Sequence, residues 1–504
     1  MIRGTENTFA QKYKGDVWCW GDSAGIDWTN PGVPTNFISQ NKGRSGTATI
    51  CDSINNLLLY TGYKRSNLTS YFRYFIYNKF NKLVLNGDSL LGEDGYHSVL
   101  LIPKPGKDSL VYLFNTIIVG GIDPYGLYYS EINYKANNDS GIVIQKNIQL
   151  NNLPAFDGLA AVRHGNGRDW WLIFKDWDPT PPYTMANTFY IYLVDENGPA
   201  LHHSQSIGGL HNDGGGHLVS NDAGDKLYHC TWGGVLQYFD FDRCTGLLSN
   251  NVIIENFHNS QPYPYYGAIS LSPNENILYA TSYTQYSAVG STDSLYQFDL
   301  TASNILASKT PIYGMSSTNV GIGSLRKAPD NKIYVASTFY NYYPYQDTSY
   351  NVFNSNLSVI NSPDSLGLAC DFQPFSFSLG GARTYAGLPN NPDYELGAWV
   401  GSPCDTLSTG LTPNPSPGER GAWMQAWYNP EWDMIHVNAS KLQGKKGVLR
   451  LLDIEGRIVF EKPAEVVSGG YFTTEIYMND LSSGVYVVHL VTDRETLSFK
   501  VGKL

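Results

Sequence analysis

Residues 272–282 read SPNENILYATS, in which a polar turn leads into a short apolar run that carries a tyrosine. Residues 328–337, APDNKIYVAS, repeat this arrangement. A turn of Asn, Asp, Pro or Gly before a run rich in Ile, Val and Tyr is typical of a hairpin that leads into a β-strand. Both stretches therefore predict antiparallel strand pairs.

The same arrangement recurs along most of the chain. It also occurs at DSINNLLLY (52–60), KPGKDSLVYLF (104–114), HGNGRDWWLIF (164–174) and NDAGDKLYHC (221–230). Alternating runs such as VLQYFDF (235–241) and SLYQFDL (294–300) come after the later turns. Period-two alternation is the pattern of a half-buried strand, so each run predicts the next strand of a sheet.

The spacing of the repeat points to one architecture. Tyr228, Tyr279 and Tyr334 hold equivalent places and lie 51 and 55 residues apart, a length that suits a blade of four strands. One hairpin cannot bury its faces, whereas blades stacked around an axis can. We predict an all-β chain with a β-propeller over residues 15–400. Seven blades are favoured, and eight blades or a pair of sandwiches are the alternatives.

Composition agrees with this prediction. The chain has 504 residues, more than one core usually organises, so a large domain and a smaller one are expected. Charged residues make up 16%, below the roughly 25% of ordinary soluble domains. Aromatic residues reach 14%, with 37 Tyr, beside 50 Gly and 26 Pro. Such a composition favours short strands and tight turns over long helices.

Charge and hydropathy exclude two classes of partner. The formal net charge is −11, and no Lys or Arg cluster stands out, which argues against nucleic acid. No apolar run approaches the roughly 18 residues of a transmembrane helix, so no transmembrane segment is expected.

The body of the chain resembles a known group of proteins. WCWGDSAGIDWTNPGVPT (18–35) and SGTATICDSINNLLLYT (45–61) are similar to the opening of secreted β-propeller proteins of Bacteroidota. Later segments of that group's sequence pattern are matched in the same order by residues 238–249, 268–282, 295–308, 327–337 and 357–389. Trp20 and Trp28 stand where the group prefers Phe. The resemblance implies a secreted propeller and brings no catalytic residues with it.

The end of the chain has a different character. Residues 401–421, GSPCDTLSTGLTPNPSPGERG, have the composition of a linker, and residues 422–504 read as short strands of a small Ig-like β-sandwich. Residues 1–14 are expected to be an N-terminal extension. They have no apolar h-region, so we expect the quoted start to be truncated or processed.

This tail resembles the type A C-terminal sorting domain of type IX secretion cargo. The resemblance rests on Pro413 to Pro415, the turn from Asp453 to Arg457, and the signal residues Gly484, Val485, Tyr486, Lys500 and Lys503. It implies export by the type IX secretion machinery to the extracellular space or the outer cell surface. An ordinary accessory sandwich is the alternative.

Six cysteines are present, with no CxxC pair among them. Cys230 and Cys244 flank a hairpin-like segment and are the candidate disulfide pair, although fifteen connectivities of the six are open. The alternative is a set of buried free thiols.

Chemistry-bearing residues gather in LHHSQSIGGLHNDGGGHL (201–218). His211, Asp213 and His217 are the candidate metal ligands, and a glycine-rich connecting loop is the alternative reading. Ser324 to Lys327 match SxxK without the companion motifs, so the match is attributed to chance. No catalytic residue and no cofactor are predicted.

Function is predicted from what remains. Tyr-rich segments at 261–270 and 338–353 suit binding of glycan or protein. We predict a secreted binding, adhesion or extracellular-assembly module. The alternative is a polysaccharide hydrolase or lyase with its site in the propeller funnel, where carboxylates distant in sequence can converge.

Overall fold

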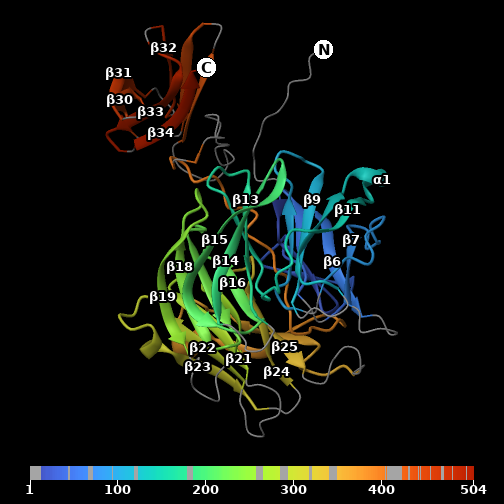
Figure 1. Ribbon diagram of the computed structural model, residues 1–504. Helices are drawn as coiled ribbons and strands as arrows, with labels where there is room; N and C mark the ends of the chain where they lie inside the picture. The colour runs from blue at the N-terminus through green and yellow to red at the C-terminus, as the bar shows by residue number, and fades with distance from the viewer. Residues whose placement is uncertain are drawn as a thin grey trace. The chain divides into compact units, whose positions relative to one another are not determined.

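The structure is a computed structural model (Figure 1). It describes residues 13–43, 46–65, 72–92, 95–118, 123–178, 185–256, 265–283, 293–316, 320–339, 349–402, 404–405, 423–429, 432–440, 442, 444–453, 456–466, 470–479, 481–494 and 496–503. The described residues fall into two compact units, one within Gln11–Gly397 and the other within Ala398–Leu504.

The described part of the larger unit holds seven antiparallel sheets, six with four strands and one with three. The three-stranded sheet is β2 (Val17–Trp20), β3 (Asp22–Asp27) and β4 (Thr35–Lys42). The next two sheets are β1 (Tyr13–Lys14), β5 (Thr49–Asp52), β6 (Leu57–Arg65) and β7 (Phe72–Asn78), then β8 (Val99–Pro103), β9 (Leu110–Ile117), β10 (Gly126–Asn133) and β11 (Ile142–Gln149).

The remaining four sheets follow in chain order. They are β12 (Ala160–Arg163), β13 (Trp170–Lys175), β14 (Ala186–Asp195) and β15 (Gly198–His211); β16 (Gly216–Ser220), β17 (Lys226–Thr231), β18 (Val235–Phe241) and β19 (Leu248–Asn256); β20 (Tyr265–Leu271), β21 (Ile277–Tyr283), β22 (Asp293–Asp299) and β23 (Thr310–Met315); and β24 (Val320–Lys327), β25 (Ile333–Phe339), β26 (Asn356–Ile360) and β27 (Phe372–Ser378). Short helices α1 (Ala136–Asp139), η1 (Leu306–Ser308) and η2 (Gly367–Cys370) lie between strands.

These sheets are the blades of a β-propeller. Each of the last five consists of four consecutive strands in sequential order. First strands of successive blades are in contact, as β12 is with β16, β16 with β20 and β20 with β24. The predicted seven-bladed all-β fold is thus confirmed.

The sequence repeat marks one place in every such blade. All six predicted hairpins connect the strand pairs β5–β6, β8–β9, β12–β13, β16–β17, β20–β21 and β24–β25. Tyr228, Tyr279 and Tyr334 lie on the second strands of three successive blades, and all three are buried. The repeated tyrosines are therefore core residues that pack within and between blades.

The first blade is completed by the end of the propeller chain. Arg383 forms β-bridges with Asp22 and Ser23, and its guanidinium pairs with the buried Asp22 carboxylate. Trp18 and Trp28, two rings of the same sheet, pack edge to face with centroids 5.3 Å apart. Trp28 also packs 4.9 Å from Tyr334 of the last blade. The aromatic cluster and the ion pair close the ring.

The disulfide prediction needs correction. Cys230 is a free, fully buried thiol, so it does not pair with Cys244. Cys244 and Cys404 are the disulfide-bonded cysteines. Cys230 lies on β17 and faces the next blade, where its Sγ lies 3.6 Å from the carbonyl oxygen of Tyr266. Cys230 is paired with Leu236 near the start of β18, whereas Cys244 lies in the turn after the far end of β18, so the strand separates the two.

The smaller unit is a sandwich of two antiparallel sheets. One sheet is β28 (Trp423–Asn429), β29 (Met434–Ser440) and β32 (Phe472–Tyr477), and the other is β31 (Ile458–Glu465), β30 (Lys446–Leu452), β33 (Gly484–Thr492) and β34 (Thr496–Lys503). Its core includes Ile435, Val437, Leu449 and Leu490. The predicted Ig-like sandwich is confirmed.

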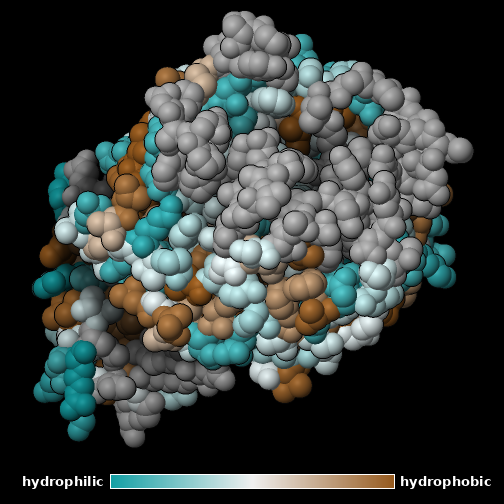
Figure 2. Space-filling view, turned by 90° about the horizontal axis from the view of Figure 1, so that it is seen from below, coloured by the Kyte–Doolittle hydropathy of each residue, from teal (hydrophilic) through white to brown (hydrophobic). Residues whose placement is uncertain are grey.

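The outer surface of the molecule is mixed in character. Brown hydrophobic and teal hydrophilic residues alternate over the described part of the face in Figure 2. Among the residues described, no helix has the length and hydropathy needed to cross a bilayer.

Candidate functional site

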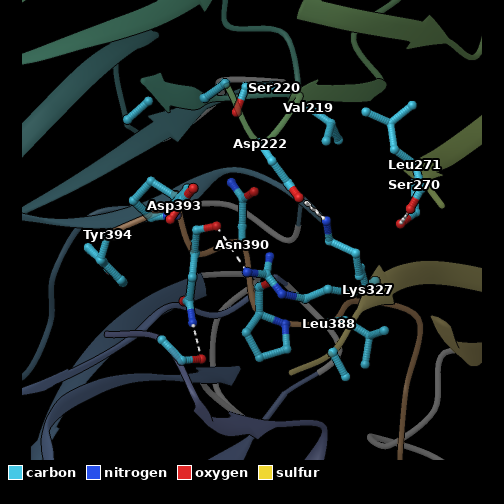
Figure 3. A pocket seen from close by; sticks show the side chains of 18 of the residues that line it. Val219, Ser220, Asp222, Ser270, Leu271, Lys327, Leu388, Asn390, Asp393 and Tyr394 are labelled. Carbon is cyan, nitrogen blue, oxygen red and sulfur yellow. Dashed lines mark hydrogen bonds and ion pairs between the residues drawn. The ribbon is translucent and has the colours of Figure 1, made fainter. Parts of the chain in front are cut away.

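The first strands of the blades converge on a cavity of about 620 Å³. Each contributes a short stretch to the wall, such as Ala160–Ala161 from β12, His217–Ser220 from β16 and Ser324–Lys327 from β24. The chain returns to this cavity after the last blade, where residues 388–397 form part of its lining. Figure 3 shows labelled residues of that segment, such as Asn390 and Asp393, together with side chains from three successive blades.

Two side chains fix this axial segment, residues 388–397, to the blades. The Asn390 amide donates hydrogen bonds to the carbonyl oxygens of His97 (3.1 Å) and Leu159 (2.9 Å). The Tyr394 hydroxyl lies 3.0 Å from the carbonyl oxygen of Thr49 and 2.7 Å from that of Leu101. Both side chains are buried, so these bonds are shielded from water.

Three arginines hold the backbone of the same segment. Arg326 donates to the carbonyl oxygens of Pro389 (2.8 Å) and Asn391 (3.1 Å). Arg163 donates to the carbonyl oxygen of Tyr394 at 2.8 Å, and Arg243 donates to that of Gly397. Burial lowers the pKa of Arg163 and of Arg326 to about 10. These guanidinium groups remain charged at neutral pH, and they fix the lining of the cavity.

Two buried histidines in the lining of the cavity stack on each other. The rings of His97 and His217 are 3.6 Å apart and nearly parallel. His97 Nδ1 is 3.1 Å from the carbonyl oxygen of Gly216, and Ser324 Oγ is 3.2 Å from His97 Nε2. Burial lowers the pKa of His97 to about 3 and lowers that of His217 well below its usual value. Both imidazoles are therefore neutral at pH 7.

The Ser324–His97 contact resembles a hydroxyl nucleophile beside a base, yet its chemistry is weak. The carbonyl oxygen of Gly216 accepts from Nδ1, so His97 Nε2 is the acceptor of the Ser324 hydroxyl proton. An imidazole whose pKa is about 3 is a poor general base at neutral pH. Both side chains are largely buried in the lining of the cavity.

Charged side chains stand where water reaches the cavity. Lys327 Nζ binds both carboxylate oxygens of Asp222, at 2.7 and 2.8 Å (Figure 3). Asp393 Oδ1 accepts the backbone N–H groups of Glu395 (2.8 Å) and Leu396 (3.2 Å). Partial desolvation raises the pKa of Asp393, and the nearby carboxylates of Asp222 and Glu395 raise it further. This part of the wall offers both charged and neutral hydrogen-bonding groups.

The predicted metal ligands do not meet in one group. His211 Nδ1 lies 2.9 Å from Asp213 Oδ2, whereas His217 stacks on His97. Within the described ranges, no three His, Cys, Asp or Glu side chains are arranged to hold a metal ion. The metal site therefore remains a prediction from the sequence, and the described structure does not bring its three candidate ligands together.

The predicted sorting residues lie on two paired strands of the smaller unit. Gly484 is opposite Lys503, Tyr486 is opposite Val501, and the next pair is Val487 with Lys500. The two ends of the predicted turn at 453–457 are in contact, since Arg457 Nε lies 2.7 Å from Asp453 Oδ2. Residues 413–415 lie outside the described residues, and so do 261–264 and 340–348 of the two Tyr-rich segments.

The sequence alone did not single out His97, Arg326, Asn390 or Asp393. Their roles depend on blades far apart in the chain, as with Asn390 and His97, which are 293 residues apart. The only local signal was the polar run NNPDYE after the last predicted strand. A run of polar residues in a loop that follows the last repeat can indicate residues of a binding site.

Comparison with known protein families identifies the smaller unit. Residues 425–502 match the family described as secretion system C-terminal sorting domain. The chain is therefore exported to the extracellular space or the cell surface, and its tail is handled by the type IX secretion system. No curated protein matches the chain.

Solved structures of several kinds are similar to this chain. A candidate 6-phosphogluconolactonase from Bacteroides fragilis NCTC 9343 has 12% identity and a TM-score of 0.44, covering 77% of this chain and 99% of that one. The periplasmic gluconolactonase PpgL of Pseudomonas aeruginosa has 12% identity and a TM-score of 0.37, with 83% and 99% covered. The β-propeller domain of Cps50 (Swd1) from Myceliophteria thermophila has 9% identity and a TM-score of 0.32, with 64% and 94% covered. Identities this low extend no activity of those proteins to this chain.

Proposed function

We propose that this exported propeller is a binding module whose axial cavity receives a polar, hydroxyl-rich ligand such as the end of a glycan. The observation that carries the proposal is the cavity itself, which is fixed by buried arginines and lined by hydrogen-bonding side chains. Its volume of about 620 Å³ falls within the range of roughly 300–1,000 Å³ typical of ligand sites.

The lining chemistry supports binding of such a ligand. Ser220, Ser270 and Asn331 present hydroxyl and amide groups, and the Asp222–Lys327 pair presents opposite charges at the same wall. Side chains of this kind donate and accept hydrogen bonds, as a sugar ring with several hydroxyl groups requires. The axial segment is already ordered by the protein, so binding does not have to fix it.

The test is retention of the full chain on a glycan array, with the variant Asp222→Asn. Loss of the charged acceptor should also release Lys327, so we expect affinity for any retained glycan to fall about tenfold. Asp88→Asn is the matched control, because Asp88 also pairs with a lysine, Lys146, but lies away from the cavity. Retention that survives in Asp222→Asn would contradict the assignment of the site. Capture of a protein alone would contradict the ligand class.

One observation favours a hydrolase as the second candidate. Desolvation raises the pKa of Asp393, and the charges of Asp222 and Glu395 act in the same direction, which is the direction that a general acid requires. A reducing-sugar assay with the wild-type chain and Asp393→Asn separates the two functions. Product release that is lost in Asp393→Asn would replace the binding module by an enzyme, whereas retention without release supports binding.

A further inference from the structure

Lys503, near the C-terminus of the sorting domain, is bound within its own unit. Its Nζ lies 2.8 Å from Asp433 Oδ2 and 2.8 Å from the carbonyl oxygen of Met478. The side chain is only 11% exposed. The ammonium group is therefore turned inward, toward the turn before β29 and the end of β32.

These contacts connect the two sheets of the sandwich. Lys503 is the last residue of β34, whereas Asp433 precedes β29 and Met478 follows β32. The Asp433 carboxylate also accepts the Tyr428 hydroxyl at 2.7 Å, and the Met478 N–H donates to the Asp433 carbonyl oxygen at 2.8 Å. Lys503 thus joins β34 to two points of the opposite sheet, and Tyr428 binds one of them, the Asp433 carboxylate.

From this geometry we propose that Lys503 serves export as a clamp that keeps β34 docked, and not as a free charge read by the secretion machinery. Asp433 is the other half of the clamp. Lys503 is a positioning residue in this sense: the docked terminal strand is what the machinery meets, and the lysine acts through it.

The strand needs such a clamp. β34 is an edge strand, paired only with β33, and it ends the described chain of this unit. Terminal segments fray unless they are tied down. Lys503 offers three donors at the last position of the strand, and the structure uses them on a carboxylate and a buried carbonyl. A receptor that gripped this ammonium would first have to undock the strand.

Lys500 behaves in a similar way on the same strand. Its Nζ lies 3.0 Å from the carbonyl oxygen of Asp405 and 3.9 Å from the Asp405 carboxylate, which is fully buried. Both lysines of the basic ending therefore face partners within the unit. The clamp at Lys503 is the tighter of the two, and it is the one that the experiment addresses.

The experiment compares export and strand docking in the full chain. Wild type, Lys503→Met, Asp433→Asn, the double variant and Lys503→Arg are produced in a host that carries the type IX system. Exported protein is measured by immunoblot of the medium and cell surface, and hydrogen exchange of the 496–503 amides is measured on the purified chain. Lys446→Met is the matched control, because it removes an exposed lysine from β30 of the same sheet.

A clamp predicts one pattern. Lys503→Met and Asp433→Asn should lower export alike, and each should speed amide exchange in β34 roughly tenfold through easier local opening. The double variant should be no worse than either single variant, because both remove the same contact. Lys503→Arg should retain much of the export, and Lys446→Met all of it.

Direct reading of the charge predicts another pattern. Asp433→Asn would then be exported like wild type, and Lys503→Met would fail while β34 kept its protection. That result would overturn the proposal. Asp433→Asn also guards against a misfolded variant, because Asn tolerates the left-handed φ of +45° at this position, whereas its neutral amide no longer forms the ion pair with Lys503.

Discussion

Acidification from pH 7 to pH 4 is expected to lower the free energy of unfolding of the propeller by about 3 kcal/mol through His97 alone. Burial lowers the pKa of His97 from 6.5 to about 3, and the nearby Arg326 lowers it in the same direction. The carbonyl oxygen of Gly216 is the one neighbour that favours the charged form. Below pH 6.5 the unfolded chain therefore takes up a proton that the folded protein excludes.

The sign of the effect follows from this difference. The stability that the folded propeller has while His97 is neutral is fully present above pH 6.5, and it is lost as the pH falls toward 3. His217 and His229 are also buried with lowered pKa values, and they act in the same direction. Asp393 acts in the opposite direction, because its raised pKa lets the folded state take up a proton earlier.

Variants separate the histidine contribution from the rest. The measurement is guanidinium unfolding of the full chain at several pH values between 4 and 7. His97→Gln cannot take up the proton, so its unfolding free energy should vary less with pH, by about 3 kcal/mol over this range. Ser324→Ala removes the hydroxyl partner and keeps the imidazole. It should change the unfolding free energy at every pH without reducing its dependence on pH. Equal slopes for wild type and His97→Gln would show that His97 does not carry the effect.

The blades could be predicted because their signals are local. A polar turn, a period-two run and a buried tyrosine all fall within a dozen residues, as in 272–282 and 328–337. The same holds for the turn from Asp453 to Arg457, where a carboxylate, a glycine at φ +77° and a guanidinium meet within five residues. Sequence reasoning is strong where one hydrogen-bonded unit occupies one stretch of chain.

The axial site could not be predicted because nothing local encodes it. Asp22 and Arg383 meet only when the ring closes, and so do Asn390 and the carbonyl oxygens that precede β8 and β12. The same reason explains the wrong disulfide. Cys230 and Cys244 are close along the chain, but Cys230 pairs with Leu236 near the start of β18, whereas Cys244 lies in the turn beyond the far end of that strand. Proximity in sequence was taken for proximity in space.

The second large effect is expected from Tyr394→Ala, which should lower the free energy of unfolding by about 4 kcal/mol. Tyr394 is 2% exposed and packs edge to face against Trp170 with centroids 6.2 Å apart. Its hydroxyl reaches the carbonyl oxygens of Thr49 on β5 and Leu101 on β8. The substitution therefore leaves a cavity at the axis and removes the hydroxyl proton that the carbonyl oxygens of Thr49 and Leu101 share.

Tyr394→Phe isolates the hydroxyl from the ring. It keeps the packing against Trp170 and should cost only about 1 kcal/mol, mainly for the lost hydrogen bonds. The measurements are the guanidinium midpoint and hydrogen exchange in 49–52 and 99–103. If the axial segment shapes the binding cavity, Tyr394→Phe should retain glycan on the array while Tyr394→Ala loses it. Removing a buried aromatic ring from a packed core loses many contacts, so Tyr394→Ala should be clearly less stable than Tyr394→Phe. Equal stability of the two variants would mean that the ring does not support the axis.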